Sequence, residues 1–449
     1  MATQPNTQGL YNHSTYTTQG DDTEHVVEVD KVQVNLFFDG TLNNYYNVTT
    51  RDDAVRRQHG GEDTSYDNAL SNVARMWKSL DDDPDGPDLG VYVEGMGTTR
   101  LQGDSTRGYA FGTGASGIQA RAQQAFPKLI DIINKKRPEG PPAMLELNLF
   151  GFSRGAATAR HFASLLRNRQ EITKHFINEW SRVVVVVNFV GLFDTVSAEG
   201  VDHGNDVDDL GLRFGDDAAK RVFHLVALDE YRANFALTTI ASACTAKTID
   251  AATGARVPMG FELGIPGSHS DVGGGYKSGT EQPEPAEVRS LPPTYKSNGR
   301  TGLQTVRGPQ AFVYAQGWYS PQDQQASNWH PHRHQRQVGG DYHKVGLSIM
   351  VDMAELCTTT VYPARFKALM SSETADVLQV QNQLRTFAKD QAFAPGKSRQ
   401  ANRGLDELLG LEVAKTFRHA YLHLSFNDSL GMHPRYKNDT ELERAHVAG

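Results

Sequence analysis

Apolar runs and segments of helical spacing alternate along the first two thirds of the chain. The β-rich apolar runs are Val32–Phe38, Leu89–Glu94, Met144–Phe150, Val183–Val190 and Phe261–Pro266, and the helical segments between them are Tyr66–Ser79, 115–135 and Ala156–Arg167. The run from Val183 is apolar on both faces, which is typical of a central strand in a sheet that is covered on both sides. The alternation from about 31 to 275 therefore predicts an α/β domain with a mostly parallel sheet and helices on both faces.

The same pattern divides the chain into four parts. Residues 1–30 are polar with few aliphatic side chains and are predicted to form a flexible tail. Residues 31–277 form the α/β core. Residues 278–340 are rich in Pro, Gly, Gln and Ser and predict a long insertion or surface loop, with a lid as its hypothesised role. Residues 341–449 return to helical patterning, at 364–390 and 404–423, and are expected to pack on the core.

Composition excludes several classes of protein. The chain has 449 residues, and Lys plus Arg minus Asp plus Glu is 45 − 53 = −8, which argues against a nucleic-acid partner. The apolar run Val183–Phe193 is too short to cross a bilayer. The polar first residues lack the basic and apolar regions of a signal peptide, so we expect synthesis in the cytoplasm without one. Cys244 and Cys357 allow one disulfide at most and no zinc site of the CxxC kind.

The sequence GFSRG, residues 151–155, lies between a predicted strand and a predicted helix. In this context it is typical of a nucleophile elbow, in which a serine sits on a tight turn and both flanking glycines let the backbone pack closely. Ser153 is then the nucleophile, and the Arg154 amide at the helix N-terminus is one donor of an oxyanion hole. A simple turn with a capping serine is the alternative.

A serine nucleophile needs a base and an orienting carboxylate. Asp194 follows the run that starts at Val183, and His269 follows Phe261–Pro266, so each comes at the end of a later predicted strand. We assign Asp194 as the acid and His269 as the base. A turn-forming or capping role for Asp194 stays open, and His423, late in the chain, is the rival base.

The loop after the first strand supplies the other predicted site residues. Gly40 is suited to give the second oxyanion amide, and Asp39, Thr41 and Asp271 are predicted to line the site; Asp39 could instead bind a cation or hold the nucleophile loop. No metal site and no cofactor are predicted. The histidines of Trp329–His334 have no carboxylate or cysteine at ligand spacing, which favours a solvated loop. The acidic loop with Asp206, Asp208, Asp209, Asp216 and Asp217 is most simply a solvated surface, and calcium binding there is the alternative, so calcium dependence is not indicated but stays open.

Five blocks in order, FFDGTLNN, GFSRGAATAR, GLFDTV, HLVALDEYRANF and PGSHSDVGGGY, resemble the catalytic domain of the type VI secretion lipase effectors of the first Tle family. They cover about residues 31–276, with weaker likeness at 346–355 and 423–430. The resemblance implies an α/β-hydrolase core. It also implies a serine phospholipase whose Ser-Asp-His triad falls on Ser153, Asp194 and His269.

The resemblance further implies phospholipase A1 or A2 activity on membrane glycerophospholipids, in the periplasm of a rival bacterium. A type VI spike protein would deliver the effector, and a cognate immunity protein would protect kin. Two other functions stay open from the residues alone. One is a soluble serine esterase that acts on a non-lipid ester, and the other is a non-catalytic module that docks to the spike.

Overall fold

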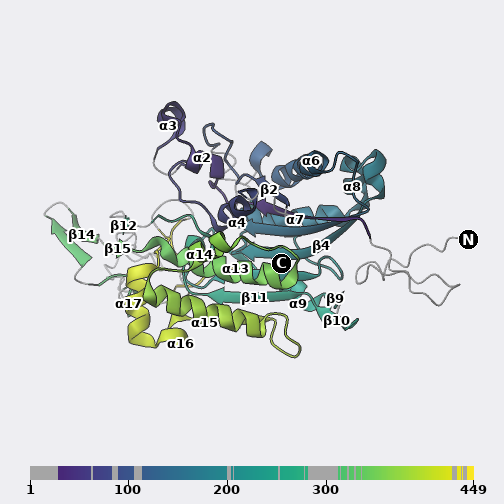
Figure 1. Ribbon diagram of the computed structural model, residues 1–449. Helices are drawn as coiled ribbons and strands as arrows, with labels where there is room; N and C mark the ends of the chain where they lie inside the picture. Colours follow the sequence, from purple (N-terminus) through teal and green to yellow (C-terminus); the bar gives the residue numbers. More distant parts are fainter. Residues whose placement is uncertain are drawn as a thin grey trace, which may run out of the picture.

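A seven-stranded parallel sheet runs through the protein, with helices on both of its faces (Figure 1). The strand order is β16-β11-β7-β4-β3-β1-β2. The computed structural model describes residues 29–61, 64–82, 89–105, 114–199, 204–205, 207–250, 253–277, 279–281, 312–313, 315–320, 323–327, 330–334, 336–426, 432–435, 437 and 442–449. The α/β class with a mostly parallel sheet is confirmed.

The strands of the sheet lie close to the apolar runs of the sequence. They are β1 (Lys31–Phe38), β2 (Leu89–Val93), β3 (Met144–Phe152), β4 (Val184–Phe193), β7 (Arg221–Ala227), β11 (Gly260–Ile265) and β16 (Gln400–Asn402). Short strands outside the sheet are β5 (Ala198–Glu199), β6 (Gly204–Asn205), β8 (Leu237–Thr238), β9 (Lys247–Ile249), β10 (Arg256–Pro258), β12 (Gly279–Glu281), β13 (Gln324–Ser327), β14 (His330–His334), β15 (Arg336–Val338) and β17 (His446–Val447).

Helices separate most successive strands of the sheet up to β11, and they dominate the last third of the described chain. They are α2 (Tyr45–Thr49), α3 (Asp53–His59), α4 (Asn72–Asp81), α6 (Ile118–Lys136), α7 (Arg154–Arg167), α8 (Arg169–His175), α9 (Ala241–Thr245), α10 (His269–Gly273), α13 (His343–Cys357), α14 (Ala364–Met370), α15 (Ala375–Gln391), α16 (Leu405–Leu409) and α17 (Leu411–Tyr421), with 3-10 turns at Gly114–Ser116, Asn178–Arg182 and Gly340–Tyr342. No helix among the described residues is long and apolar enough to cross a membrane.

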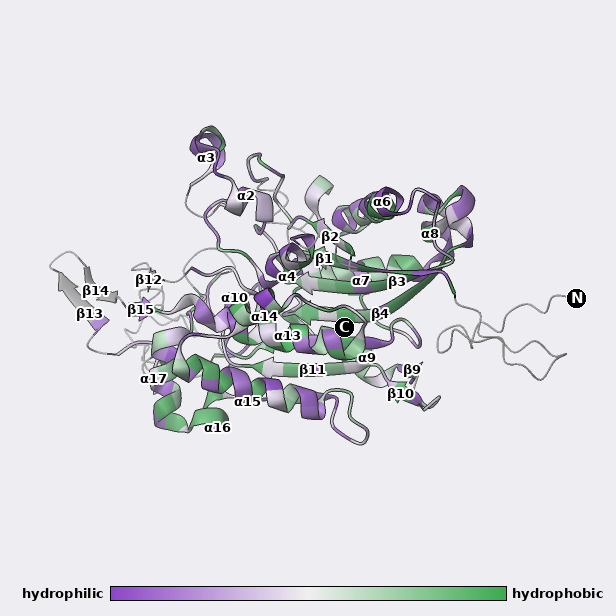
Figure 2. Cartoon of the chain, in the orientation of Figure 1, coloured by the Kyte–Doolittle hydropathy of each residue, from purple (hydrophilic) through white to green (hydrophobic). Residues whose placement is uncertain are grey.

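The two faces of the sheet bury separate apolar cores. On one face, alternate residues such as Val34, Leu36 and Phe38 pack against α6 and α7. On the other face, aromatic side chains such as Phe37 and Phe150 pack against α4, α13 and α15. In Figure 2 the strands β3, β4 and β11 are accordingly drawn largely in the green of hydrophobic residues. Successive side chains of a strand point to opposite faces, so a two-sided core requires strands that are apolar throughout.

The last third of the chain belongs to the same folded body as the core. Helix α13 packs on β4, β7 and α10, and β16 pairs with β11 at the edge of the sheet. The helical patterning at 364–390 corresponds to two helices, α14 and α15. The patterning at 404–423 corresponds to α16 and α17, which Gly410 separates with a φ of 81°. The helix expected from Tyr66 begins only at Asn72, because the Ser71 side chain caps its N-terminus.

Most of two predicted segments lies outside the described residues, namely 1–28 of the predicted tail and 282–311 of the predicted insertion. The described parts of 278–340 include two antiparallel pairs, β12 with β15 and β13 with β14. The lid therefore stays a hypothesis.

Candidate active site

The chain order of the strands reverses next to β1, which marks one edge of the sheet as a place for a site. From β1 the chain moves outward to β2, then returns to β3 on the other side of β1 and continues toward β16. In open parallel sheets, such a reversal leaves a crevice at the carboxyl ends of the strands. Asp39 follows β1 and Ser153 follows β3, so the structure brings both to the carboxyl ends of neighbouring strands at this reversal.

Ser153 occupies a strained turn between β3 and α7. Its φ of 57° and ψ of −128° are unusual for a residue with a side chain. A Cβ on Gly151 would lie 2.5 Å from the Gly155 carbonyl oxygen, and one on Gly155 would lie 2.3 Å from the carbonyl oxygens of Phe38 and Asp39. Both positions therefore require glycine, and the turn has the geometry of a nucleophile elbow.

Asp194 leaves β4 directly beside this turn. The Ser153 N–H donates to the Phe193 carbonyl at 3.0 Å, and the Val196 N–H donates to the Ser153 carbonyl at 3.3 Å. Asp194 itself has a φ of 44° and is fully buried. The backbone thus fixes the carboxylate next to the nucleophile turn.

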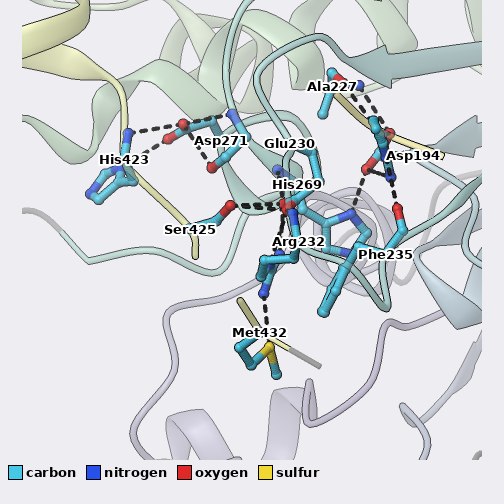
Figure 3. A network of polar contacts seen from close by, with 12 residues as sticks. Asp194, Ala227, Glu230, Arg232, Phe235, His269, Asp271, His423, Ser425 and Met432 are labelled. Carbon is cyan, nitrogen blue, oxygen red and sulfur yellow. Dashed lines mark hydrogen bonds and ion pairs between the residues drawn. The ribbon is translucent and has the colours of Figure 1, made fainter. Parts of the chain in front are cut away.

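His269 is the first residue of α10, after β11, and it completes the group. Its Nδ1 lies 2.5 Å from Asp194 Oδ2 (Figure 3). The residue is 4% exposed, and its ring contacts the rings of Phe152 and Phe235, whose centroids are 4.7 and 5.1 Å away. Burial lowers the pKa of His269, although the hydrogen bond and charge of Asp194 act in the opposite direction. A neutral imidazole oriented by a carboxylate is suited to accept a proton.

The Asp194 carboxylate has further partners that sequence reasoning missed. Arg444 donates from Nη1 to Oδ1 at 2.6 Å and from Nη2 to Oδ2 at 2.8 Å, and the Ala227 N–H donates to Oδ1 at 2.9 Å. Burial alone would raise the pKa of Asp194, but the Arg444 charge and His269 hold it well below its usual range. The carboxylate is therefore ionised. No motif marks Arg444, which is far from the triad in sequence.

A second buried ion pair lies on the other side of His269. Arg232 donates to both carboxylate oxygens of Glu230, and the Ser425 hydroxyl lies 3.0 Å from each oxygen (Figure 3). The backbone N–H of His269 donates to Glu230 Oε2 at 3.2 Å. Burial would raise the pKa of Glu230, but the charge and hydrogen bonds of Arg232, together with the nearby charge of Arg444, lower it to about 2. This pair anchors the backbone of the histidine.

His423, the rival base, pairs with another carboxylate. Its ring Nδ1 lies 2.7 Å from Asp271 Oδ1, and its backbone N–H donates to Asp271 Oδ2. Asp271 also caps α10 by accepting from the Ser268 N–H and hydroxyl. Asp271, predicted to line the site, thus stiffens the helix that carries His269, and Asp194 orients His269 rather than His423.

The oxyanion loop differs from the expectation for Gly40. The Gly40 N–H donates to Asp39 Oδ1 at 2.8 Å, so this amide is already occupied. Within the described part of the chain, the Thr41 N–H has no acceptor, and the Thr41 hydroxyl accepts from Arg154 Nε at 2.7 Å. Thr41 is therefore better placed than Gly40 to offer a free amide beside Arg154.

Asp39 holds this loop rather than a cation. The Tyr92 hydroxyl donates to Asp39 Oδ2 at 2.5 Å, and the carboxyl is 2% exposed. Burial raises the pKa of Asp39 to about 6, although its hydrogen bonds act to lower it. No group of His, Cys, Asp or Glu in the described ranges is arranged to hold a metal. Three carboxylates of the acidic loop pair with arginines, Asp208 with Arg213 and both Asp216 and Asp217 with Arg256. Asp206 and Trp329 lie outside the described residues.

Comparison with known proteins finds a matching family model and similar solved structures. The model for the catalytic domain of Tle1-like phospholipase effectors of the type VI secretion system matches residues 33–169 and 166–292. The structure of the Tle1 effector bound to the VgrG spike is similar over 92% of this chain and 88% of that chain, with 20% identity and a TM-score of 0.55. An uncharacterized protein from Pseudomonas aeruginosa is 20% identical over 86% of this chain and 52% of that chain, with a TM-score of 0.45. No curated protein matches.

Proposed function

Because this chain belongs to the Tle1-like family of type VI secretion phospholipase effectors, we propose that it is a serine phospholipase of the A1 or A2 class. The observation that carries the proposal is the buried Asp194–His269 hydrogen bond at the end of the strand next to the Ser153 turn. This arrangement supports acyl-ester hydrolysis through a covalent acyl-enzyme.

In the proposed reaction, His269 Nε2 takes the proton of the Ser153 hydroxyl as its oxygen attacks the acyl carbonyl. Asp194 keeps the proton of the neutral ring on Nδ1 and stabilises the imidazolium that forms. The amides of Arg154 and Thr41 receive the oxyanion, with Thr41 replacing Gly40 because the Gly40 amide is occupied. The lysolipid leaves with the His269 proton. Water then attacks the acyl-enzyme through the same base and releases the fatty acid.

Delivery is the second part of the proposal. The Tle1 effector of similar fold is bound to a VgrG spike, which supports a spike protein as carrier for this chain. The substrate is then membrane glycerophospholipid on the periplasmic side of the target cell, and a cognate immunity protein protects the producer. Co-sedimentation of the purified chain with a type VI spike protein tests the carrier.

The enzymatic part is tested by acyl release from vesicles of phosphatidylethanolamine and phosphatidylglycerol. Wild type and the control Ser164→Ala, which changes a serine elsewhere on α7, are expected to release fatty acid, and Ser153→Ala is expected to release none. The lysolipid isomer assigns the A1 or A2 position. Hydrolysis of a short soluble ester but not of lipid would contradict the lipid substrate. No hydrolysis of either substrate would contradict the proposed enzymatic activity and favour a spike-docking module.

A further inference from the structure

We propose that Arg444 is a positioning residue of the active site, which locks the Asp194 carboxylate in place and so leaves His269 as the neutral base of the triad. The inference rests on the proposed function, because it concerns the proton transfers of that same triad. It concerns a residue outside the five sequence blocks and outside the matched family model.

The Arg444 guanidinium binds the Asp194 carboxylate in a bidentate arrangement, which we call the fork. The fork distances are 2.6 and 2.8 Å, and the guanidinium also donates from Nε to the Phe235 carbonyl at 2.8 Å and from Nη1 to the Ala227 carbonyl at 3.3 Å. The side chain is 5% exposed and that of Asp194 is fully buried. A planar fork with this many fixed partners allows the carboxylate one orientation.

The segment that carries Arg444 is held in place independently of the ion pair. The Leu237 N–H donates to the Ala445 carbonyl, and β17 pairs in parallel with β8. The Thr238 N–H of β8 in turn donates to the Thr195 carbonyl, next to Asp194. The short strand β8 thus connects the last described segment to the end of β4, and the fork is pre-formed.

The charges around His269 come in pairs of opposite sign. Asp194 from the end of β4 is matched by Arg444, and Glu230 from the end of β7 is matched by Arg232. On α10, Asp271 is paired with His423. Each carboxylate near the ring already has a partner. The carboxylates therefore stabilise an imidazolium less than an unpaired Asp would. The structure therefore favours the neutral base, and Arg444 is the cation on the triad carboxylate.

The test compares the pH dependence of kcat/KM on a soluble short-chain ester for wild type, Arg444→Met and Arg444→Lys. The control is Glu443→Gln, which changes the charge of the neighbouring residue, whose carboxylate pairs with Arg435. Without the Arg444 cation, Asp194 stabilises the imidazolium more, so the acid limb of Arg444→Met is expected to move up by about one pH unit. Arg444→Lys keeps the charge but not the fork, so its limb stays near that of wild type while kcat falls by about tenfold. Glu443→Gln leaves the limb in place.

An active Arg444→Met protein with an unchanged acid limb would overturn the inference while leaving the Ser153 enzyme intact. Failure of both Arg444 variants to fold, seen as loss of the cooperative thermal transition, would make Arg444 a stability residue and would also overturn it. Wild-type activity that persists in Ser153→Ala would instead contradict the proposed function itself.

Discussion

Replacing Asp194 by Asn changes both catalysis and stability, because the carboxylate serves His269, Arg444 and the Ala227 amide at once. With its oxygen on the Oδ1 side, the Asn side chain keeps the bonds from Ala227 and from Arg444 Nη1. Its NH₂ group then faces Arg444 Nη2 and His269 Nδ1, where a carboxylate oxygen had accepted. His269 satisfies the NH₂ by accepting at Nδ1, which moves the ring proton to Nε2. In that tautomer the ring cannot take the Ser153 proton.

The expected loss in kcat is about 10⁴-fold, the size seen when a triad Asp becomes Asn and the imidazole takes the wrong tautomer. This corresponds to about 5 kcal/mol of transition-state stabilisation. The folded state loses the charge that neutralises Arg444, which is 5% exposed, so we expect a drop of about 3–5 kcal/mol in the free energy of unfolding.

The assay pairs kcat on a soluble ester with urea unfolding. The matched control is Asp352→Asn on α13, because Asp352 also binds an arginine two-fold, with Arg385 Nε at 2.7 Å and Nη2 at 2.9 Å, yet contacts no triad residue. The control is expected to lose stability but to keep kcat. An Asp194→Asn enzyme within tenfold of wild-type kcat would refute the assignment of Asp194, and an unchanged free energy of unfolding would refute the energetic account of the Arg444 pair.

Three further predictions follow from the site. Burial lowers the pKa of His269, so the acid limb of kcat/KM should have its midpoint below about 6.5, the ordinary value for histidine; a pH–rate profile with a higher midpoint would contradict this. The folded-state pKa of Asp39 is raised to about 6, so its contribution to stability is complete below pH 4 and is lost as pH rises through 6. Asp39→Asn should remove this loss, and in urea unfolding at pH 7 it should be up to about 3 kcal/mol more stable than wild type. A variant less stable than wild type would argue against this. Gly155→Ala places a Cβ 2.3 Å from backbone oxygens and should cost about 3 kcal/mol or more, measured as a lower urea midpoint; a midpoint equal to that of wild type would show that the turn can relax.

The sequence predicts those parts of the site that follow strand ends. Ser153, Asp194 and His269 each come just after an apolar run, and parallel strands bring their carboxyl ends to one edge, so the motifs and the topology agree. The acidic partner of His269 could be chosen for the same reason. The choice between His269 and His423 as the base required the structure, which pairs His423 with Asp271.

Long-range contacts from the end of the chain could not be predicted in this way. Arg444 lies in a short segment without periodicity, and its role depends on the pairing of two-residue strands, β8 with β17. The three-residue strand β16 likewise carries too little pattern to be recognised. The Gly40 amide was assigned from its loop position alone, and the hydrogen bond to Asp39 depends on a side-chain rotamer that no sequence pattern encodes.

Labelling with a fluorophosphonate is the decisive test of Ser153 as the nucleophile. This reagent reacts with activated serines, so we expect one adduct on wild type, mapped by peptide mass spectrometry to Ser153, with parallel loss of lipid hydrolysis. Ser153→Ala and His269→Ala should take up no label, whereas Ser164→Ala should label like wild type. Label on another residue, or full lipid hydrolysis after complete labelling of Ser153, would contradict the account.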